Sequence, residues 1–401
     1  MSCICEIIDA MMKKILFVYP HNFLEHTMGT NTRIRALARE LCRMGYTIDL
    51  YALSNFVSRY DGFAALNKEE SLVNKLYLYD YAEIRRYSKR KRRFNRLLGR
   101  HRQEMLDNWV TPGMVEQFNE IVSAGDYTHI VMFYAYTADL LLPENYRGHE
   151  GVCKIYFMED LLSVGAYVSG QSSAIGSLLD DEMKRISVFD RIACISYDEK
   201  IWIEKLMKGR HHVDFLPHLV ERKVVDTSEP DALKHPRVVF VGYDNPYNIE
   251  GMKWFLQEVY PSLSPEVELT VVGKVNRHLH VEYPNLHQID YVPDLDEMYR
   301  HTDIIICPLL NGTGMKIKVV EAMSYGIPVV CTSRGVDGLP DKTRNGCLVA
   351  DDAAAFAGHI NRLVCDTAFY KQCQQQVKDY FSTTLDWSRH KDTLLHLFRE
   401  E

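Results

Sequence analysis

The sequence has no long apolar run, no paired cysteine spacing and no excess of positive charge, and each absence excludes a class of protein. No apolar stretch approaches the ~20 residues that a membrane-spanning helix needs. The ten cysteines are scattered singly apart from Cys3 and Cys5, so neither a disulfide framework nor a structural zinc site is supported. The net charge of −7 argues against a general nucleic-acid-binding protein. A reducing cytoplasm fits these observations best.

The N-terminal residues MSCICEIIDAMMKK have neither the basic start nor the uninterrupted apolar region of a signal peptide, because Lys13 and Lys14 end the apolar stretch. Met11 and Met12 are alternatives to Met1 as the natural start. The length of 401 residues suits two domains of similar size. Hydrophobic residues at 46% and charged residues at 25% are average for a globular protein.

Short apolar runs alternate with helical patterns through both halves, which predicts α/β architecture with two doubly wound domains. The run KILFVYP at 14–20 is typical of a buried parallel strand. Residues 32–44 place Ile34, Leu37 and Leu41 at helical spacing, and Gly45 ends the helix. Further strands are expected at 46–53, 129–133, 154–158 and 191–196 in the first half, and at 237–242, 268–273, 286–292 and 303–309 in the second.

The chain between Leu216 and Arg237 becomes polar, carries three prolines and loses periodicity, which predicts an interdomain linker. We therefore divide the sequence into a first Rossmann-like domain at 1–216, a linker at 217–236, a second Rossmann-like domain at 237–380 and a final segment at 381–401.

The segment IIICPLLNGTGMKIKVVEAMSYGIPVV at 304–330 is the strongest functional signal. It predicts a buried strand, a glycine-bearing turn, a helix beginning near Met315 and a second strand. Gly312 and Gly314 allow positive φ and close approach of the backbone to a ligand, and the N–H groups of the helix start suit an anion. Lys316 and Lys318 add positive charge. Glu321 follows Lys318 by three positions, so both lie on one helical face.

These residues together suit a sugar nucleotide, with the diphosphate at the helix start and the ribose hydroxyls at Glu321. Each element also has a simpler interpretation. Lys318 and Glu321 are at the spacing of a surface ion pair, which contributes under ~0.5 kcal/mol, and a Gly-x-Gly turn alone is weak evidence. Their convergence between two predicted strands favours the ligand site.

At these residues the sequence resembles the donor site of the GT-B glycosyltransferases of family 4, a large group of retaining enzymes. Many members carry a second glutamate eight positions before Glu321, where this chain has Thr313. The run from Gly312 to Lys318 instead resembles the Gly-x-Gly-x-Lys/Arg-x-Lys variant of a subgroup that acts on bacterial surface polysaccharides. The segments PYNIEGMKWFLQEVYPSL at 246–263 and Ile195 to Asp198 are similar to that subgroup as well.

The resemblance implies a GT-B fold, with two Rossmann-like domains facing across a cleft and a final helix that returns to the first domain. It also implies contacts of the Tyr291 and Val292 backbone with the nucleotide base, and of Gly29 with the donor phosphate. Gly29 can equally belong to a plain turn that caps the next helix. Glu159 and Asp160 follow the strand at 154–158 and are the candidate catalytic carboxylates, with a solvated loop acid or a cap as the alternative.

Several other residue patterns have ordinary explanations. Asp294-Leu295-Asp296 is the spacing of a metal and nucleotide ligand in another glycosyltransferase fold, but Asp294 directly precedes a helix pattern and Glu297 follows three residues later, which predicts a helix N-cap. His21, His26 and His218 lie near loop ends without a partner in the sequence, so we interpret them as ordinary polar contacts.

The run RRYSKRKRRFNRLLGRHR at 85–102 contains ten basic residues and no acidic one. A solvated helix face is the simplest interpretation, but exposed helices usually mix signs. An anionic membrane attracts such a cluster at ~1 kcal/mol per basic residue, and Tyr87 and Phe94 add an apolar component. Nucleic acid is a less favoured partner, because no recognition fold accompanies the run.

We therefore predict a retaining glycosyltransferase that moves a sugar from a nucleotide-diphosphate donor to a glycan or lipid-linked acceptor in bacterial surface polysaccharide synthesis. We expect it to need no cofactor and no metal, to bind no nucleic acid, and to work in the cytoplasm, including at the inner membrane face. One alternative is a catalytically silent GT-B subunit that binds a nucleotide or a partner enzyme. A second is an RNA-binding protein that uses the basic run. The sequence leaves the sugar, base, acceptor and linkage open.

Overall fold

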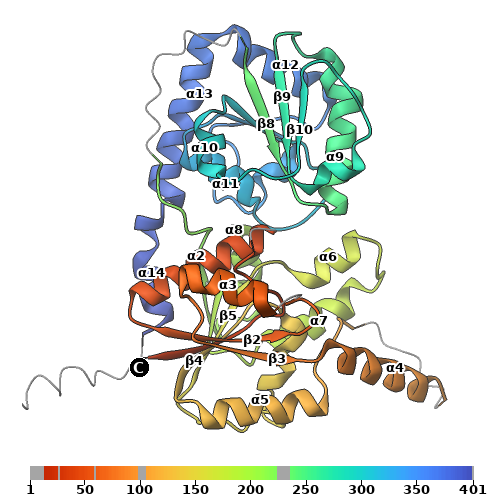
Figure 1. Cartoon of the computed structure of the whole chain (residues 1–401), viewed down its shortest axis with the longest axis vertical. Coiled ribbons are helices and arrows are strands. Elements are labelled where there is room, and N and C mark those ends of the chain that lie inside the picture. Colours follow the sequence, from red (N-terminus) through yellow and green to blue (C-terminus); the bar gives the residue numbers. More distant parts are fainter. Residues whose placement is uncertain (1–12, 26–27, 58–59, 98–104, 224–234, 400–401) are drawn as a thin grey trace, which may run out of the picture. The chain divides into compact units, whose positions relative to one another are not determined.

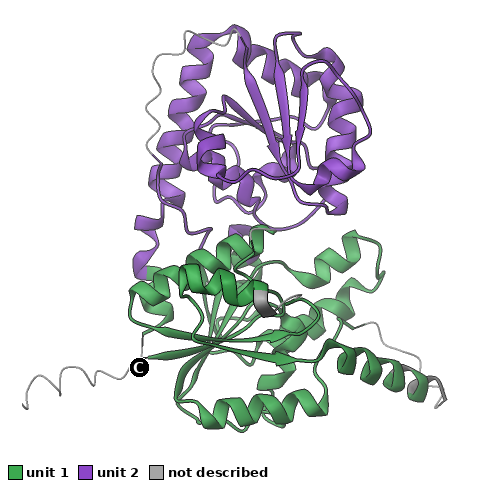
Figure 2. Ribbon diagram, in the orientation of Figure 1, with its two compact units in different colours: residues 1–195, 200–215, 393–401 green, residues 196–199, 216–392 purple. Residues whose placement is uncertain are grey.

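The chain folds into two compact units in the computed structural model, which describes residues 13–25, 28–57, 60–97, 105–223 and 235–399 (Figure 1). The first unit comprises residues 1–195, 200–215 and 393–401, and the second comprises 196–199 and 216–392 (Figure 2). The alternative starts Met1, Met11 and Met12, together with His26 and residues 98–102 of the basic run, lie outside the described residues.

The first unit is built on a seven-stranded sheet with the order β3-β2-β1-β4-β5-β6-β7. Every neighbouring pair in it is parallel. Its strands are β1 (Lys14–Val18), β2 (Thr47–Leu53), β3 (Lys75–Tyr79), β4 (Tyr127–Met132), β5 (Cys153–Met158), β6 (Arg191–Cys194) and β7 (His212–Phe215). The α-helices are α2 (Gly29–Arg43), α3 (Tyr60–Glu70), α4 (Tyr81–Leu97), α5 (Pro112–Ala124), α6 (Leu162–Val168), α7 (Ile175–Ile186), α8 (Tyr197–Leu206) and α14 (Lys391–Leu397).

The second unit repeats this design on a six-stranded sheet with the order β10-β9-β8-β11-β12-β13, again with parallel pairs throughout. Its strands are β8 (Arg237–Val241), β9 (Glu268–Val272), β10 (Leu286–Ile289), β11 (Ile304–Cys307), β12 (Val329–Cys331) and β13 (Cys347–Val349). Its α-helices are α9 (Pro246–Trp254), α10 (Leu295–Arg300), α11 (Ile317–Ser324), α12 (Ala353–Cys365) and α13 (Thr367–Tyr380).

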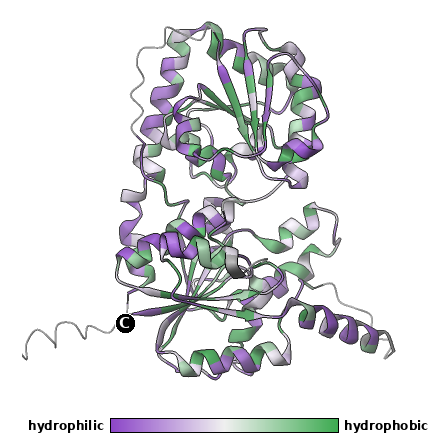
Figure 3. Ribbon diagram, viewed as in Figure 1, coloured by the Kyte–Doolittle hydropathy of each residue, from purple (hydrophilic) through white to green (hydrophobic). Residues whose placement is uncertain are grey.

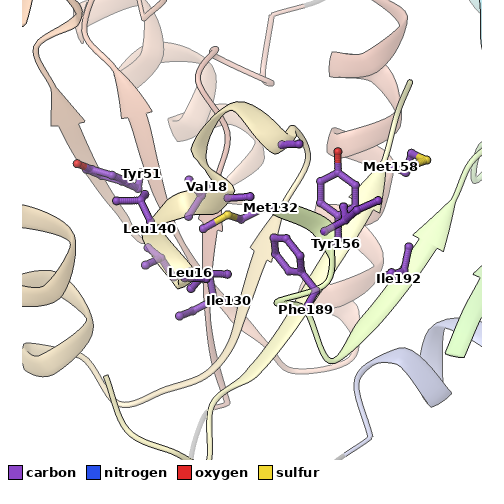
Figure 4. Packing of buried hydrophobic residues seen from close by; sticks show 14 of the residues in the cluster. Leu16, Val18, Tyr51, Ile130, Met132, Leu140, Tyr156, Met158, Phe189 and Ile192 are labelled. Carbon is purple, nitrogen blue, oxygen red and sulfur yellow. The ribbon is translucent and has the colours of Figure 1, made fainter. Parts of the chain in front are cut away.

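Both sheets are covered on both faces, as their sequences predict. Consecutive residues Ile15, Leu16 and Phe17 of β1 are fully buried, because helices pack on either side of a parallel sheet. In the first unit Leu16, Ile130, Tyr156, Phe189 and Ile192 share one core cluster (Figure 4). A separate cluster in the second unit includes Phe240, Val271, Ile306 and Phe356. In Figure 3 the strands of both sheets contain hydrophobic (green) segments alongside hydrophilic (purple) ones.

The predicted α/β class and the two doubly wound sheets are confirmed, whereas several short elements were not predicted. The strands β3 and β7 lie at the two edges of the first sheet, and their half-buried residues give a weaker apolar signal than a central strand. The helix α9 begins at Pro246, where the Asn245 side chain caps it by accepting a hydrogen bond from the N–H of Asn248.

The return of the chain to the first unit begins at Thr393, twelve residues after the predicted boundary at 381. The intervening residues belong to the second unit for a physical reason. Phe381, Leu385 and Trp387 are buried, and the Trp387 N–H donates to the Val220 carbonyl at 3.0 Å. The unit boundary at 215/216 lies beside the start of the predicted linker.

Candidate functional site

The loop between β11 and α11 has the backbone that its glycines predict. Gly312 has φ +116° and Gly314 has φ +73°. Residues with a Cβ adopt these backbone conformations only at an energetic cost. The helix α11 begins at Ile317, two residues after the predicted start near Met315. Met315 is buried.

Lys318 lies in the first turn of α11 and contacts one residue of the first strand of the unit and one residue of the helix that follows it. Its Nζ lies 4.0 Å from the Phe240 ring centroid and donates to Asn248 Oδ1 at 2.9 Å. Phe240 belongs to β8 and Asn248 to α9, so this ammonium lies where the strand order reverses between β8 and β11. Burial lowers the pKa of Lys318 to about 8. In doubly wound sheets this switch point is where ligands bind.

Glu321 lies one turn further along α11. Its Oε2 accepts a hydrogen bond from the Tyr299 hydroxyl at 2.9 Å, and its Oε1 lies 3.9 Å from His218 Nε2. The Glu321 side chain is 19% exposed. Burial raises the pKa of Glu321 to about 7, against the opposing effects of the Tyr299 hydrogen bond and Lys318. The carboxylate has capacity to accept further hydrogen bonds from hydroxyl groups.

A chain of contacts supports Tyr299 from behind. The Tyr299 and Tyr325 rings stack with centroids 5.1 Å apart, the Tyr325 hydroxyl donates to Asp296 Oδ1, and Asp296 Oδ2 lies 3.1 Å from Lys223 Nζ. Burial acts to raise the pKa of Asp296, but the hydrogen bonds from Tyr325 and Lys223 outweigh it and the pKa is lowered. Asp296 therefore helps to fix the ring that holds Glu321.

The predicted helix cap at Asp294 is confirmed. Its side chain accepts hydrogen bonds from the N–H groups of Asp296 and Glu297. Both acids of the Asp-x-Asp pair therefore have structural partners in the second unit.

The Lys316 side chain contacts the protein backbone, whereas the sequence suggested that it would add positive charge for a ligand. Its Nζ donates to the carbonyls of Thr313 at 2.9 Å and Gly314 at 2.7 Å, and the residue is buried. The ammonium thus folds back onto the glycine loop, because these carbonyls are the nearest acceptors once the loop turns. Its charge stays beside the loop, while its donors hold the loop in shape.

The residues predicted to contact the base lie beyond the carboxyl end of β10. Tyr291 is 70% exposed, and Val292 is half-buried. The edge strand β10 ends at Ile289, so both residues follow it in the loop that leads to α10. This position agrees with the carboxyl-end rule for ligands of parallel sheets.

In the first unit the loop after β1 is fixed by Asn31. Its Oδ1 accepts from the Tyr19 hydroxyl at 2.8 Å, and its Nδ2 donates to the carbonyls of Asn22 and Glu25, both at 3.1 Å. Gly29 is the first residue of α2 and is exposed. Its backbone therefore lies at the carboxyl edge of the sheet, where the sequence places it.

Glu159 is placed differently from the expectation for a catalytic carboxylate. It forms an ion pair with Arg33 of α2, and each side chain is only 3% exposed. Burial raises the pKa of Glu159 to about 7, opposed by Arg33. Asp160 is half-buried. Burial of the Tyr134 hydroxyl raises the pKa of Tyr134, and the negative charge of Asp160 raises it further.

Four residues that the sequence reasoning did not assign contribute to the site in the second unit. Phe240, Asn248, Tyr299 and His218 contact Lys318 or Glu321. Asn248 carried a signal, since its segment resembles the polysaccharide subgroup. His218 was interpreted as an ordinary polar contact, because its partner lies 103 positions away in the sequence.

Comparisons with known proteins identify the fold and match one family model. Residues 235–366 match the family model of the glycosyl transferases group 1. The solved structure of Anabaena HepE in complex with UDP-glucose is similar with a TM-score of 0.63 and 14% identity, over 96% of this chain and 98% of that one. S. aureus TarM has a TM-score of 0.67 and 10% identity, over 97% and 100%. The fold is GT-B.

The GT-B assignment and the family match confirm the predicted resemblance, which the family model covers for residues 235–366. A Klebsiella pneumoniae relative named "Uncharacterized 44.6 kDa protein in cps region" is 30% identical over 189 residues, 43% of this chain and 47% of that protein. The chain thus spans less than half the length of the curated relatives it matches. Among the described residues, no helix has the length and apolarity needed to cross a bilayer.

The raised pKa of Glu321 predicts a pH-dependent stability. Between its ordinary value of 4.5 and about 7, the folded state binds more protons than the unfolded state, so stability falls as pH rises through this window. Glu321→Gln removes this titration. We therefore compare the thermal unfolding midpoint of the variant with that of wild type at each pH. From about pH 5 to about pH 7.5, we expect this difference to shift by several degrees in favour of the variant, which corresponds to roughly 2–3 kcal/mol of unfolding free energy.

Differential scanning calorimetry of both proteins across this range checks the prediction. The pKa of Glu159 is also raised, so Glu159 changes the stability with pH in the same direction. Because Glu159 is present in both proteins, its contribution cancels in the difference between the two midpoints. A difference between the two midpoints that stays constant with pH would contradict the assigned environment of Glu321.

Proposed function

We propose that this chain is a retaining glycosyltransferase that transfers a sugar from a nucleotide-diphosphate donor to a glycan or lipid-linked acceptor in bacterial surface polysaccharide synthesis. The observation that carries the proposal is the pair Lys318 and Glu321, one turn apart behind the loop of Gly312 and Gly314 at the strand-order reversal. The match to glycosyl transferases group 1 and the relative from a cps region support it.

The chemistry assigned to Lys318 follows from its surroundings. A departing nucleotide diphosphate gains negative charge, and a preorganised cation in a water-poor site stabilises that charge more than solvent does. The pKa of about 8 reflects a desolvated ammonium, and a bound diphosphate would favour its charged form. The N–H groups of Gly314 and Met315 are assigned to the same phosphate oxygens.

The chemistry assigned to Glu321 is recognition of the donor rather than proton transfer. Its carboxylate is positioned by Tyr299 and has capacity for two vicinal hydroxyls, which suits a ribose. The Tyr291 and Val292 backbone is assigned to the base. We expect the acceptor to attack the same face of the donor sugar that the diphosphate leaves. In the first unit we assign Asp160 to orienting the acceptor or to stabilising positive charge on the donor sugar.

Aromatic rings support the assignment of the acceptor to the first unit. Trp109 stacks on Tyr136 with ring centroids 4.5 Å apart and an interplanar angle of 15°, and Phe56 lies 6.1 Å from Trp109 and 4.5 Å from His21. His21, Phe56 and Tyr136 follow β1, β2 and β4, so the rings line the carboxyl edge of the sheet. Their apolar, negatively polarised faces suit the C–H faces of sugar rings.

The competing function is a catalytically silent GT-B subunit. Thr313 replaces a carboxylate that is common in the family, and Glu159 is held by Arg33. Both observations favour this alternative, whereas the arrangement of Lys318 and Glu321 favours the enzyme. Donor hydrolysis or transfer by the purified protein separates the two functions.

The basic helix α4 supports a peripheral position at the inner membrane face. Its side chains at 85, 86, 89, 90, 91 and 93 are exposed, and Phe94 is 60% exposed. Ile84 is buried and anchors the start of the helix. The helix is strongly hydrophilic in Figure 3. Attraction of this cluster to acidic lipid headgroups would bring the protein to a lipid-linked acceptor.

Substitution of the two site residues tests the proposed function. Lys318→Ala and Glu321→Gln are each expected to lower kcat on the order of 10²–10³-fold, because each removes a preorganised contact to the donor. Initial rates with the cognate donor and acceptor measure the effect. Lys253→Ala and Glu258→Gln, at exposed positions of the same unit, are the matched controls. Near-normal turnover in both site variants would refute the donor-site assignment.

The membrane position predicts loss of vesicle binding when the basic cluster is removed. We expect substitution of Arg90, Lys91, Arg92 and Arg93 by Ser to weaken binding to vesicles containing acidic phospholipid by up to ~10³-fold, at ~1 kcal/mol per basic residue. Sedimentation with vesicles measures binding, and nucleotide binding should be unchanged.

A matched control removes the same number of charges elsewhere, at the exposed residues Lys205, Lys253, Arg344 and Lys371. Equal sedimentation of the α4 variant and wild type would exclude this membrane contact. Tight, salt-dependent RNA binding that the α4 substitutions abolish would instead favour nucleic acid.

The donor site also predicts transfer without a divalent metal. We assign the leaving diphosphate to a helix start and to lysine ammonium groups, and these ammonium groups repel a nearby divalent cation. Asp294 and Asp296, the acids of the Asp-x-Asp pair, have other partners. We expect the initial rate to be unchanged in excess EDTA. A loss of activity that Mg²⁺ or Mn²⁺ restores would mean that a metal stabilises the leaving group.

A further inference from the structure

Three side chains of metal-ligating types meet at an edge of the sheet in the first unit, and none of them has a role assigned above. His212 and Asp214 lie on the edge strand β7, and their spacing of two puts both side chains on one face of the strand. His396 comes from α14, 182 positions after Asp214. One ligand atom from each of the three lies within 4.8 Å of those of the other two.

We propose that His212, Asp214 and His396 bind one Zn²⁺ ion, which fastens the C-terminal helix to the edge of the first sheet. Two imidazoles and one carboxylate are ligands that zinc prefers, with a fourth position left for water. In tetrahedral coordination with bonds of ~2.0–2.2 Å, neighbouring ligand atoms lie roughly 3.4 Å apart. His212 Nε2 is 3.0 Å from Asp214 Oδ1, and His396 Nδ1 is 3.7 Å from Asp214 Oδ2.

A second observation points to a ligand at the same place. Asp214 Oδ2 is buried and accepts no hydrogen bond from the described residues, although a buried carboxylate oxygen is costly to leave without a hydrogen bond. The two histidine rings have centroids 5.0 Å apart and an interplanar angle of 74°, and each ring places one nitrogen within 4 Å of an Asp214 carboxylate oxygen. A cation there would satisfy the Asp214 carboxylate.

The backbone around the cluster is already fixed, which reduces the entropic cost of binding. The Arg191 guanidinium donates to the carbonyls of His396, Leu397 and Arg399 at 3.1, 3.0 and 2.7 Å. Arg191 is also the register partner of His212 across β6 and β7. The Tyr46 hydroxyl donates to the Phe398 carbonyl at 2.9 Å. The helix carrying His396 is thus held beside β7 before any ion binds.

The experiment uses the full-length, tag-free protein after EDTA treatment and desalting. Zn²⁺ affinity is measured by competition with a chromophoric chelator. We expect one site per chain, weakened at least about 10–100-fold in His212→Ala and in His396→Ala. His287→Ala, which removes an exposed histidine of the second unit, should bind like wild type.

Thermal unfolding gives an independent measurement. Zn²⁺ should raise the unfolding midpoint of wild type and His287→Ala, but not that of His396→Ala. Because His212 and His396 are exposed, the variants should have the midpoint of wild type in EDTA, which shows that they fold. Zinc binding of equal affinity in all four proteins would place the ion elsewhere in the chain and overturn the proposal, as would no binding at stoichiometric Zn²⁺.

Discussion

The parallel arrangement of both sheets is the constraint on which the candidate site depends. Parallel strands require crossover connections, so the loop after every strand leaves the same edge of the sheet. Residues far apart in the sequence therefore meet where the strand order reverses. Lys318 and Asn248 are separated by 70 positions and are 2.9 Å apart, because β8 and β11 are neighbours in the sheet. The local sequence supplies the loop, and the topology supplies its partners.

Burial of opposite charges on α11 would make the proposed donor site responsive to a ligand. The pKa of Lys318 is lowered to about 8 and that of Glu321 is raised to about 7, so desolvation outweighs the stabilising contacts that each group has in the free protein. A diphosphate beside the lysine and hydroxyl donors beside the glutamate would favour the charged forms. In the proposed donor site, the unfavourable burial would be a source of selectivity for a ligand that carries both groups.

The sequence was informative wherever one element contained the whole signal. Positive φ at Gly312 and Gly314 and the Asp294 cap follow from local backbone chemistry, and both predictions are confirmed. Contacts between distant segments were not predictable in the same way. The ion pair of Glu159 with Arg33 joins residues 126 positions apart. The edge strands β3 and β7 were missed because only part of each strand is buried.

Glu159 and Glu321 show why a shifted pKa does not by itself identify a functional carboxylate. Burial raises the pKa of both to about 7. Glu159 faces a guanidinium and is almost fully enclosed, so its acceptor capacity is directed to holding α2 on the sheet. Glu321 accepts from the hydroxyl of Tyr299, which orients the carboxylate without neutralising it, and it keeps partial exposure at the strand-order reversal. The difference in partner, rather than in pKa, is why we propose an architectural role for Glu159 and a recognition role for Glu321.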